Sequence, residues 1–356
     1  MALNLDHLAE KAGVSKATVS RVLNGSSQVT AQAKATVMKV VKETGYQLPP
    51  RRRKRQKVAR TPKLRTGNIL LLNVGDQPVV DLRSTGYPDL MRGVENETQT
   101  HGLKLVLASL YPDGPLPAAL KTDAVDGVLL YGRNDQMSQA AMNRLKQLAV
   151  VALMRGFDSL NGPADRVLFD NAKVGPLALD YLVSRGHKHI GFYNVDPKHP
   201  AFVARLADFK ARALQHQVAV TEFISPDTPT GLRAETAAFR LLINKWQKKH
   251  PQVTGFYVAC DYQLPQLCTA MDGLGIEPSA KCDLIGCDNM ALFLDQITPR
   301  PASIDINLEL VGRRGVQQLL WRLTNQNVKN PIKVLVEPVL VEGHIPSSGD
   351  VRSAKK

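Results

Sequence analysis

A short segment near the N-terminus carries residue types that could read the bases of DNA. Residues 16–23 have apolar side chains at helical spacing, with Val19, Val22 and Leu23 on one side. The opposite, outward side carries small, polar and basic residues: Lys16, Ala17, Ser20, Arg21 and Asn24. An outward arginine can donate two hydrogen bonds to guanine, worth about 1–3 kcal/mol of discrimination, whereas alanine offers only apolar contact. Arg21 is therefore the first candidate for a base contact, and Lys16 is the second.

Residues 4–45 predict three short helices that would hold this face in position. Asn4 can cap the first helix, and Gly13 ends it before a tight turn. Ser15 can cap the second helix, and the third begins after Thr30 and stops at Gly45. Two helices joined by a three-residue turn that contains glycine are typical of a helix-turn-helix, whose second helix enters the major groove.

The same segment resembles the DNA-binding headpiece of the LacI/GalR family of bacterial transcription regulators. The resemblance lies in the run LAEKAGVSKATVSRVLNGSSQVTAQAKATVMKVVKETGY. It implies that Lys16 and Ala17 read base edges and that Arg21 contacts a guanine. It also implies contacts with the DNA backbone by six residues: Asn4, Ser15, Thr18, Ser20, Asn24 and Gln28. From the residues alone, Asn4 and Ser15 could equally be helix caps, and Thr18 could only fill space beside the turn.

The positive charge of the chain is concentrated in its first fifth. Of the formal net charge of +14, residues 1–66 hold 15 Lys/Arg against 3 Asp/Glu, and the remainder is close to neutral. This distribution indicates a module that binds a polyanion, with nucleic acid favoured over an anionic membrane surface. A basic run stands where the family has a hinge helix with an apolar wedge: Arg51, Arg52, Arg53, Lys54 and Arg55. We expect these residues to contact DNA phosphates or a narrow minor groove, the alternative being a solvated linker.

The rest of the chain alternates short apolar segments with amphipathic ones, which predicts an α/β fold with parallel sheets flanked by helices. We expect strands at 68–74, 103–109, 126–132, 150–154, 189–195, 253–259, 283–287 and 301–306. The expected helices are 88–100, 136–147, 172–185, 203–215, 233–249, 262–274 and 308–324. In such sheets ligands bind beyond the carboxyl ends of the strands.

This body resembles the family's effector domain, which is built like a two-lobed periplasmic sugar-binding protein. Its anchors include VDGVLLYG, ARLADF, FYVACD and LIGCDN. The resemblance implies that Arg205 and Asp288 hold an effector, and a carboxylate and a guanidinium suit sugar hydroxyls. A salt bridge between these two that closes an empty cleft, or a surface position for Arg205, is the alternative. Further candidates for effector contact are Cys260, which stands where the family often has Asn, Asp261, and Asp76, Arg83 and Tyr87 of the loop 75–89.

Several other classes of function are not indicated by the sequence. We find none of the glycine-rich, nucleophile or zinc motifs that mark common enzymes, so we expect neither an enzyme nor a cofactor. The four cysteines lack metal-site spacing and predict core thiols. No apolar run reaches the roughly 18 residues of a membrane helix, so we expect a cytoplasmic protein that makes no membrane contact and is associated with the nucleoid when bound to DNA.

We therefore expect an all-α helix-turn-helix headpiece at 1–48, a basic linker at 49–66, a two-lobed domain at 67–345 and a polar tail at 346–356. The N-lobe is expected at about 67–160 and 290–322, and the C-lobe at about 161–289 and 323–345. The expected function is a homodimeric repressor that binds a palindromic operator in double-stranded DNA and is controlled by a sugar or sugar derivative. The alternative is a DNA-binding regulator without a small-molecule effector, controlled by a protein partner or constitutive.

Overall fold

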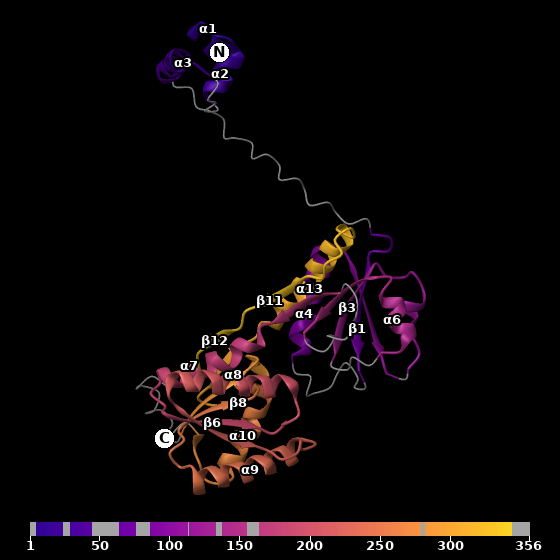
Figure 1. The fold of residues 1–356 in the computed structure, drawn as a ribbon, viewed down its shortest axis with the longest axis vertical. Helices are drawn as coiled ribbons and strands as arrows, with labels where there is room; N and C mark the ends of the chain where they lie inside the picture. The colour runs from indigo at the N-terminus through magenta and orange to yellow at the C-terminus, as the bar shows by residue number, and fades with distance from the viewer. Residues whose placement is uncertain are drawn as a thin grey trace, which may run out of the picture. The chain divides into compact units, whose positions relative to one another are not determined.

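The computed structural model describes residues 5–23, 29–44, 64–75, 86–112, 114–132, 137–154, 164–278 and 282–343. The chain divides into two compact units, Met1–Thr61 and Pro62–Lys356 (Figure 1). The described part of the first unit has three helices, α1 (Leu5–Ala12), α2 (Lys16–Leu23) and α3 (Ala31–Thr44). The predicted helix 16–23 is thus confirmed with its bounds. The second unit contains the α/β fold.

Two six-stranded sheets form the second unit. The first has the strand order β11-β5-β4-β3-β1-β2, and the pairings between these strands are all parallel. Its strands are β1 (Asn68–Val74), β2 (Lys104–Leu110), β3 (Gly127–Gly132), β4 (Ala149–Leu153), β5 (Asp165–Phe169) and β11 (Lys333–Val336). We call this sheet and its helices the N-lobe; the helices are α4 (Tyr87–Thr100), α5 (Ala118–Lys121), α6 (Gln139–Leu145) and α13 (Leu308–Thr324).

The second sheet has the order β12-β10-β9-β8-β6-β7, and only the pairing of β10 with β12 is antiparallel. Its strands are β6 (His189–Asn194), β7 (Ala219–Ile224), β8 (Gly255–Val258), β9 (Asp283–Cys287), β10 (Ala302–Asp305) and β12 (Val339–Val341). We call this sheet and its helices the C-lobe. The helices are α7 (Val174–Ser184), α8 (Pro200–His216), α9 (Leu232–Lys249), α10 (Leu264–Asp272) and α12 (Ala291–Leu294), with 3-10 turns at Asn171–Lys173 and Asp261–Gln263.

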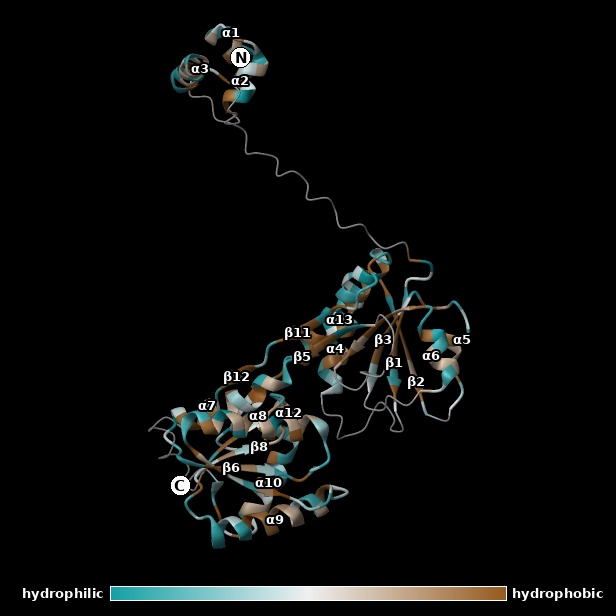
Figure 2. Ribbon diagram, in the orientation of Figure 1, coloured by the Kyte–Doolittle hydropathy of each residue, from teal (hydrophilic) through white to brown (hydrophobic). Residues whose placement is uncertain are grey.

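Both sheets are buried on both faces, which explains the continuous apolar runs of their central strands (Figure 2). In β1, Ile69 and Leu71 belong to the same core cluster as residues of α4 and α13, whereas Leu70 and Leu72 pack with residues of α5 and α6. In the C-lobe, one cluster joins the sheet to α7 and α8, and a second, aromatic cluster joins it to α9 and α10. Alternation along each strand therefore directs side chains to two separate helix layers.

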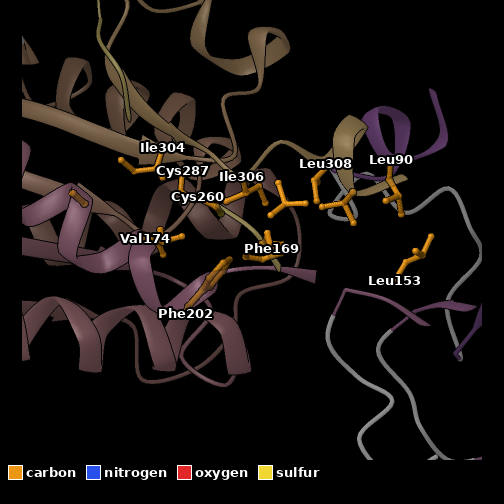
Figure 3. Close-up of a cluster of buried hydrophobic side chains, with 14 of the residues drawn as sticks. Leu90, Leu153, Phe169, Val174, Phe202, Cys260, Cys287, Ile304, Ile306 and Leu308 are labelled. Atoms are coloured by element: carbon orange, nitrogen blue, oxygen red, sulfur yellow. The ribbon is translucent and has the colours of Figure 1, made fainter. Parts of the chain in front are cut away.

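The chain passes between the lobes at three places, and the expected lobe bounds are wrong at each of them. Strands β5 and β11 belong to the N-lobe sheet, although they fall in segments assigned to the C-lobe, and β10 belongs to the C-lobe sheet. The crossings therefore follow Phe169, Asp305 and Val336. Figure 3 shows Ile306 and Leu308 of the second crossing between C-lobe residues such as Val174 and the N-lobe residue Leu90.

Four strands were absent from the sequence expectation: β5, β7, β11 and β12. The segment of β5 begins with two charged residues, β11 and β12 are very short, and β7 is an edge strand with mostly half-buried residues. Each therefore lacks the apolar run by which the central strands are recognised. Among the described residues, no helix combines the length and the apolar character needed to cross a bilayer.

Candidate DNA-reading helix and effector cleft

The orientation of α2 is fixed by a small apolar core. Val19 is fully buried and Val22 is 5% exposed, and both pack in one cluster with Leu8 of α1 and Val37 of α3. These two valines lie on one side of α2, so the opposite side must face outward. The predicted inward position of the valines is thereby confirmed.

The outward side of α2 carries the residues that the sequence assigned to DNA. Lys16, Ala17 and Arg21 are exposed, and Thr18 and Ser20 are half-buried. Lys16 Nζ lies 2.8 Å from Asp6 Oδ2 of α1, and both side chains remain more than half exposed. Arg21 forms no ion pair with any described residue. Lys16 is thus held by an ion pair to α1, whereas Arg21 has no ion-pair partner among the described residues.

Ser15 has a local role that is independent of DNA. Its Oγ accepts a hydrogen bond from the backbone N–H of Thr18 at 3.1 Å and lies 2.9 Å from Thr18 Oγ1. This is the geometry of a helix N-cap, one of the two roles that the sequence left open. Ten predicted site residues lie outside the described residues: Asn4, Asn24, Gln28, Arg51, Arg52, Arg53, Lys54, Arg55, Asp76 and Arg83.

Arg205 and Asp288 meet at the carboxyl end of the C-lobe sheet. Arg205 lies on α8 and is 2% exposed, and its Nη2 is 3.3 Å from Asp288 Oδ1. Its Nε donates to Asn171 Oδ1 at 2.9 Å and its Nη1 donates to the Ala259 carbonyl at 2.8 Å. The guanidinium is therefore held in one orientation. Its burial excludes a surface position for Arg205, and the salt bridge with Asp288 is present.

The backbone of Asp288 has an unusual conformation. Its φ is +106°, and that of the following Asn289 is +51°. A positive φ is costly for a residue with a Cβ, and such positions are common at ligand sites. Burial raises the pKa of Asp288, and the guanidinium of Arg205 offsets part of that effect. The side chain of Asp288 is 14% exposed, so part of it is accessible.

Asp261 and Cys260 have internal positions. Asp261 is fully buried, and its carboxylate accepts hydrogen bonds from the Met290 N–H and from Ser303 Oγ, each at 2.9 Å. Burial, followed by the negative charge of Asp288, raises the pKa of Asp261 well above its ordinary value. Cys260 is 1% exposed, and burial raises the pKa of its thiol. These contacts show that Asp261 joins β10 to the start of α12, a structural role that the sequence did not suggest.

Tyr87 is the first residue of α4, not part of the loop before it. Its ring packs against that of Tyr131 with centroids 5.1 Å apart, and burial raises its pKa to about 12. Sequence reasoning overlooked Asn171, which follows β5 and holds Arg205. No local signal in the sequence marked Asn171, because β5 was not recognised as a strand, and residues are assigned to the ligand side of such a sheet only where a strand end is known.

Comparison with known proteins agrees with this arrangement of two units. A family model described as bacterial regulatory proteins, lacI family, matches residues 4–48, and a periplasmic binding protein-like domain matches residues 179–344. The chain carries the lacI family's DNA-binding helix-turn-helix at residues 4–48, joined to an α/β body with the two-sheet architecture of periplasmic binding proteins.

Relatives in the lacI family align over almost the whole chain. The ribose operon repressor of Haemophilus influenzae is 27% identical over 339 residues, which are 94% of this chain and 96% of that protein. A complex of the transcriptional regulator CelR with cellobiose has a TM-score of 0.61 and 23% identity, covering 96% of this chain and 99% of the other. The lac repressor dimer bound to operator and the anti-inducer ONPF has a TM-score of 0.59 and 19% identity, covering 96% and 98%.

Proposed function

We propose that this protein is a homodimeric repressor in the cytoplasm that reads a palindromic operator with α2 and responds to a carbohydrate effector. The observation that carries the proposal is the packing of α2, which buries Val19 and Val22 and presents Lys16 and Arg21 to solvent. A helix of eight residues is about 12 Å long and can reach only a few base pairs. A specific operator therefore requires two headpieces and two half-sites. The related lac repressor structure is a dimer on its operator.

Exposed apolar residues of the second unit support the dimer. Strand β2 is at the edge of the N-lobe sheet, where Leu107 is 53% exposed. On α12 of the C-lobe, Leu292 is 70% exposed. An edge strand with exposed apolar side chains readily associates with another chain. We infer that β2 and α12 belong to the dimer interface.

The paired Arg205 and Asp288 support a carbohydrate effector. The partly exposed Asp288 carboxylate can accept hydrogen bonds from adjacent hydroxyl groups of a sugar. Arg205 holds that carboxylate in place through its own hydrogen bond to Oδ1. The H. influenzae relative is a ribose operon repressor, and the CelR structure contains cellobiose. We propose Asp288 and Arg205 as the primary effector contacts and Tyr87 as a further one. Cys260 and Asp261 are buried, so we propose that they support the site from within, and Asp76 stays a candidate outside the described residues.

A regulator without a small-molecule effector is the second candidate. The observation that favours it is that the guanidinium of Arg205 already donates hydrogen bonds within the protein, to Asn171, to the Ala259 carbonyl and to Asp288. The cysteine at position 260 also offers no amide to a sugar.

Selection of binding sites from random double-stranded DNA tests the DNA-reading role. We expect an enriched palindrome for the wild-type protein, and Arg21→Ala should lose preference at one position of each half-site by about 1–3 kcal/mol. A variant with Arg51, Arg52, Arg53 and Arg55 replaced by Ala is the control. It should bind all DNA more weakly with a flatter salt dependence. Absence of an enriched sequence would refute the proposed function, and reversed effects of the two variants would exchange their roles.

Calorimetry with a panel of pentoses, hexoses and sugar acids separates the two candidates. A ligand that binds wild type but not Asp288→Asn, and that changes operator affinity, supports effector control. No binding across the panel by a protein that still selects its operator supports the second candidate. Circular dichroism of Asp288→Asn controls for loss of fold.

A further inference from the structure

The carboxylate of Asp126 collects three successive backbone N–H groups where the linker joins the N-lobe. Its Oδ1 accepts from the Arg65 N–H at 2.6 Å, and its Oδ2 accepts from the N–H groups of Thr66 at 3.1 Å and Gly67 at 2.7 Å. Thr66 Oγ1 donates to the same Oδ2 at 2.8 Å. Asp126 is 8% exposed. Four donors on one buried carboxylate make a fixed attachment, which we call the Asp126 clamp.

The local sequence is suited to this geometry. Gly67 has φ +72°, which a residue with a side chain adopts at a cost, although a Cβ at this position would meet no atom within 4 Å. A left-handed residue at the end of a turn lets consecutive N–H groups converge on one anion. Burial raises the pKa of Asp126, but the hydrogen bonds from Arg65, Thr66 and Gly67 more than offset this, so that its pKa is lowered. The clamp is therefore ionised at neutral pH.

The clamp is continuous with the central strands of the N-lobe sheet. The backbone N–H of Asp126 donates to the Asn68 carbonyl at 2.9 Å, and that of Lys104 donates to the Gly67 carbonyl at 2.9 Å. Beside it, Arg65 lies 3.5 Å from Asp123, whose side chain is 68% exposed. Asp126 precedes β3, so it lies at the amino end of this parallel sheet, whereas the effector site lies beyond the carboxyl ends of strands.

We propose that Asp126 is a positioning residue that ends the linker at Arg65 and makes it move with the N-lobe sheet. This inference rests on the proposed function, because it concerns how the effector domain places the headpieces. Without the clamp, residues 65–67 add about 10 Å of slack chain to each subunit, at roughly 3.3–3.6 Å per residue. Shifts of elements at subunit interfaces are about 1–2 Å. Slack of that size would absorb such a shift before it reached the headpiece.

Limited digestion with trypsin tests the attachment without DNA or effector. The Arg65–Thr66 bond is in the clamp, so wild type should be cut there at least tenfold more slowly than after Lys63. Asp126→Asn should raise the rate after Arg65 at least tenfold. Gly67→Ala, which keeps every charge, should raise it in the same direction. Asp272→Asn removes the same charge from an exposed position on α10 of the C-lobe, away from Arg65, and should leave the rate unchanged. An unchanged rate in Asp126→Asn would overturn the attachment.

Operators with altered half-site spacing test the positioning role. When one or two base pairs are added or removed between the half-sites, wild type and Asp272→Asn should lose at least tenfold in affinity. Asp126→Asn and Gly67→Ala should lose threefold or less, because slack tolerates a changed separation. A merely structural defect would lower affinity equally at every spacing, and that result would refute the positioning role. If no operator sequence can be selected, the proposed function is refuted. The trypsin digestion, which needs no DNA, still shows whether Asp126 attaches residues 65–67 to the N-lobe.

Discussion

Lys16 and Arg21 lie on the outward side of α2, and of these two only Lys16 forms an ion pair within the part of the chain that the structure describes. Its ion pair with Asp6 is exposed, and such pairs contribute about 0–1 kcal/mol. If Lys16 contacts DNA as proposed, binding must break or rearrange this pair, whereas the proposed base contact of Arg21 requires no described ion pair to break. The outward position of both residues could be predicted from helical spacing, but the pair with Asp6 could not, because it joins residues of two helices across a turn.

Replacement of Asp6 by Asn tests the role of its ion pair with Lys16. Asp6→Asn should raise affinity for the selected operator by two- to tenfold, because it releases Lys16 and removes a negative charge near DNA. Fluorescence anisotropy with labelled operator measures the effect. Glu10→Gln removes an equal charge from the exposed side of the same helix without touching Lys16. Equal gains from the two variants would show that the pair itself has no role.

Asp283 should make the stability of the folded protein depend on pH in the acidic range. Burial raises the pKa of Asp283, but hydrogen bonds from Arg185 and His187 outweigh this and lower it. Because the folded-state pKa is lower than the unfolded value of about 3.9, its stabilisation is present above that pH. The stabilisation is lost as the pH falls through the folded-state pKa.

Melting temperatures between pH 5 and pH 3 measure this contribution. Asp283→Asn should be less stable than wild type at pH 5 and should lose less stability on acidification. Asp295→Asn, which removes an exposed carboxylate paired with Arg300, is the control and should follow the wild-type curve. Parallel curves for wild type and Asp283→Asn would contradict the assigned role.

Helices α4 and α13 pack closely enough to require glycine where they touch. A Cβ on Gly312 would lie 2.2 Å from the Leu90 carbonyl oxygen, and one on Gly93 would lie 2.0 Å from that of Glu309. Backbone atoms cannot move aside as a side chain can. Neither close approach could be predicted from the sequence, because the partner lies more than 200 residues away in the chain.

Substitution of Gly312 by alanine should therefore destabilise the N-lobe by about 1–3 kcal/mol, despite the higher helix propensity of alanine. Gly315→Ala on the same helix is the matched control. Its Cβ would meet the end of the Leu153 side chain, which can rotate away. The loss in free energy of unfolding should therefore be smaller. Urea unfolding measures both. A loss for Gly315→Ala equal to or greater than that for Gly312→Ala would contradict the argument.

The sequence predicted the central strands and the long helices well, because each has an uninterrupted period or apolar run. It did not reveal the strands β5, β7, β11 and β12, because these strands are defined by pairing with other strands in the folded sheet and not by a local apolar run. In the proposed effector site the sequence singled out Arg205 and Asp288, whereas Asn171 and the internal role of Asp261 depend on contacts between distant segments. Pairing of strands that are far apart in the chain is set by tertiary structure, not by local pattern.

At the scale of the whole molecule, the proposed dimer depends on exposed apolar surface. Leu107→Glu should weaken dimerisation at least tenfold, because it places a charge on the β2 edge. Operator binding should then become more dependent on protein concentration. Sedimentation velocity measures the association. Leu214→Glu on α8, where the side chain is 80% exposed, should leave the dimer intact. A dimer unaffected by Leu107→Glu would place the interface elsewhere.

The three crossings also restrict how this protein could exchange parts with its relatives. Neither lobe is encoded by one continuous stretch, since the chain leaves and re-enters each of them. A single recombination event between residues 101 and 307 would combine α4 of one parent with α13 of the other. Such a hybrid would keep its shape only where both parents carry small residues at the helix contact. Exchange of segments between relatives is therefore constrained by Gly93 and Gly312, where the two helices touch.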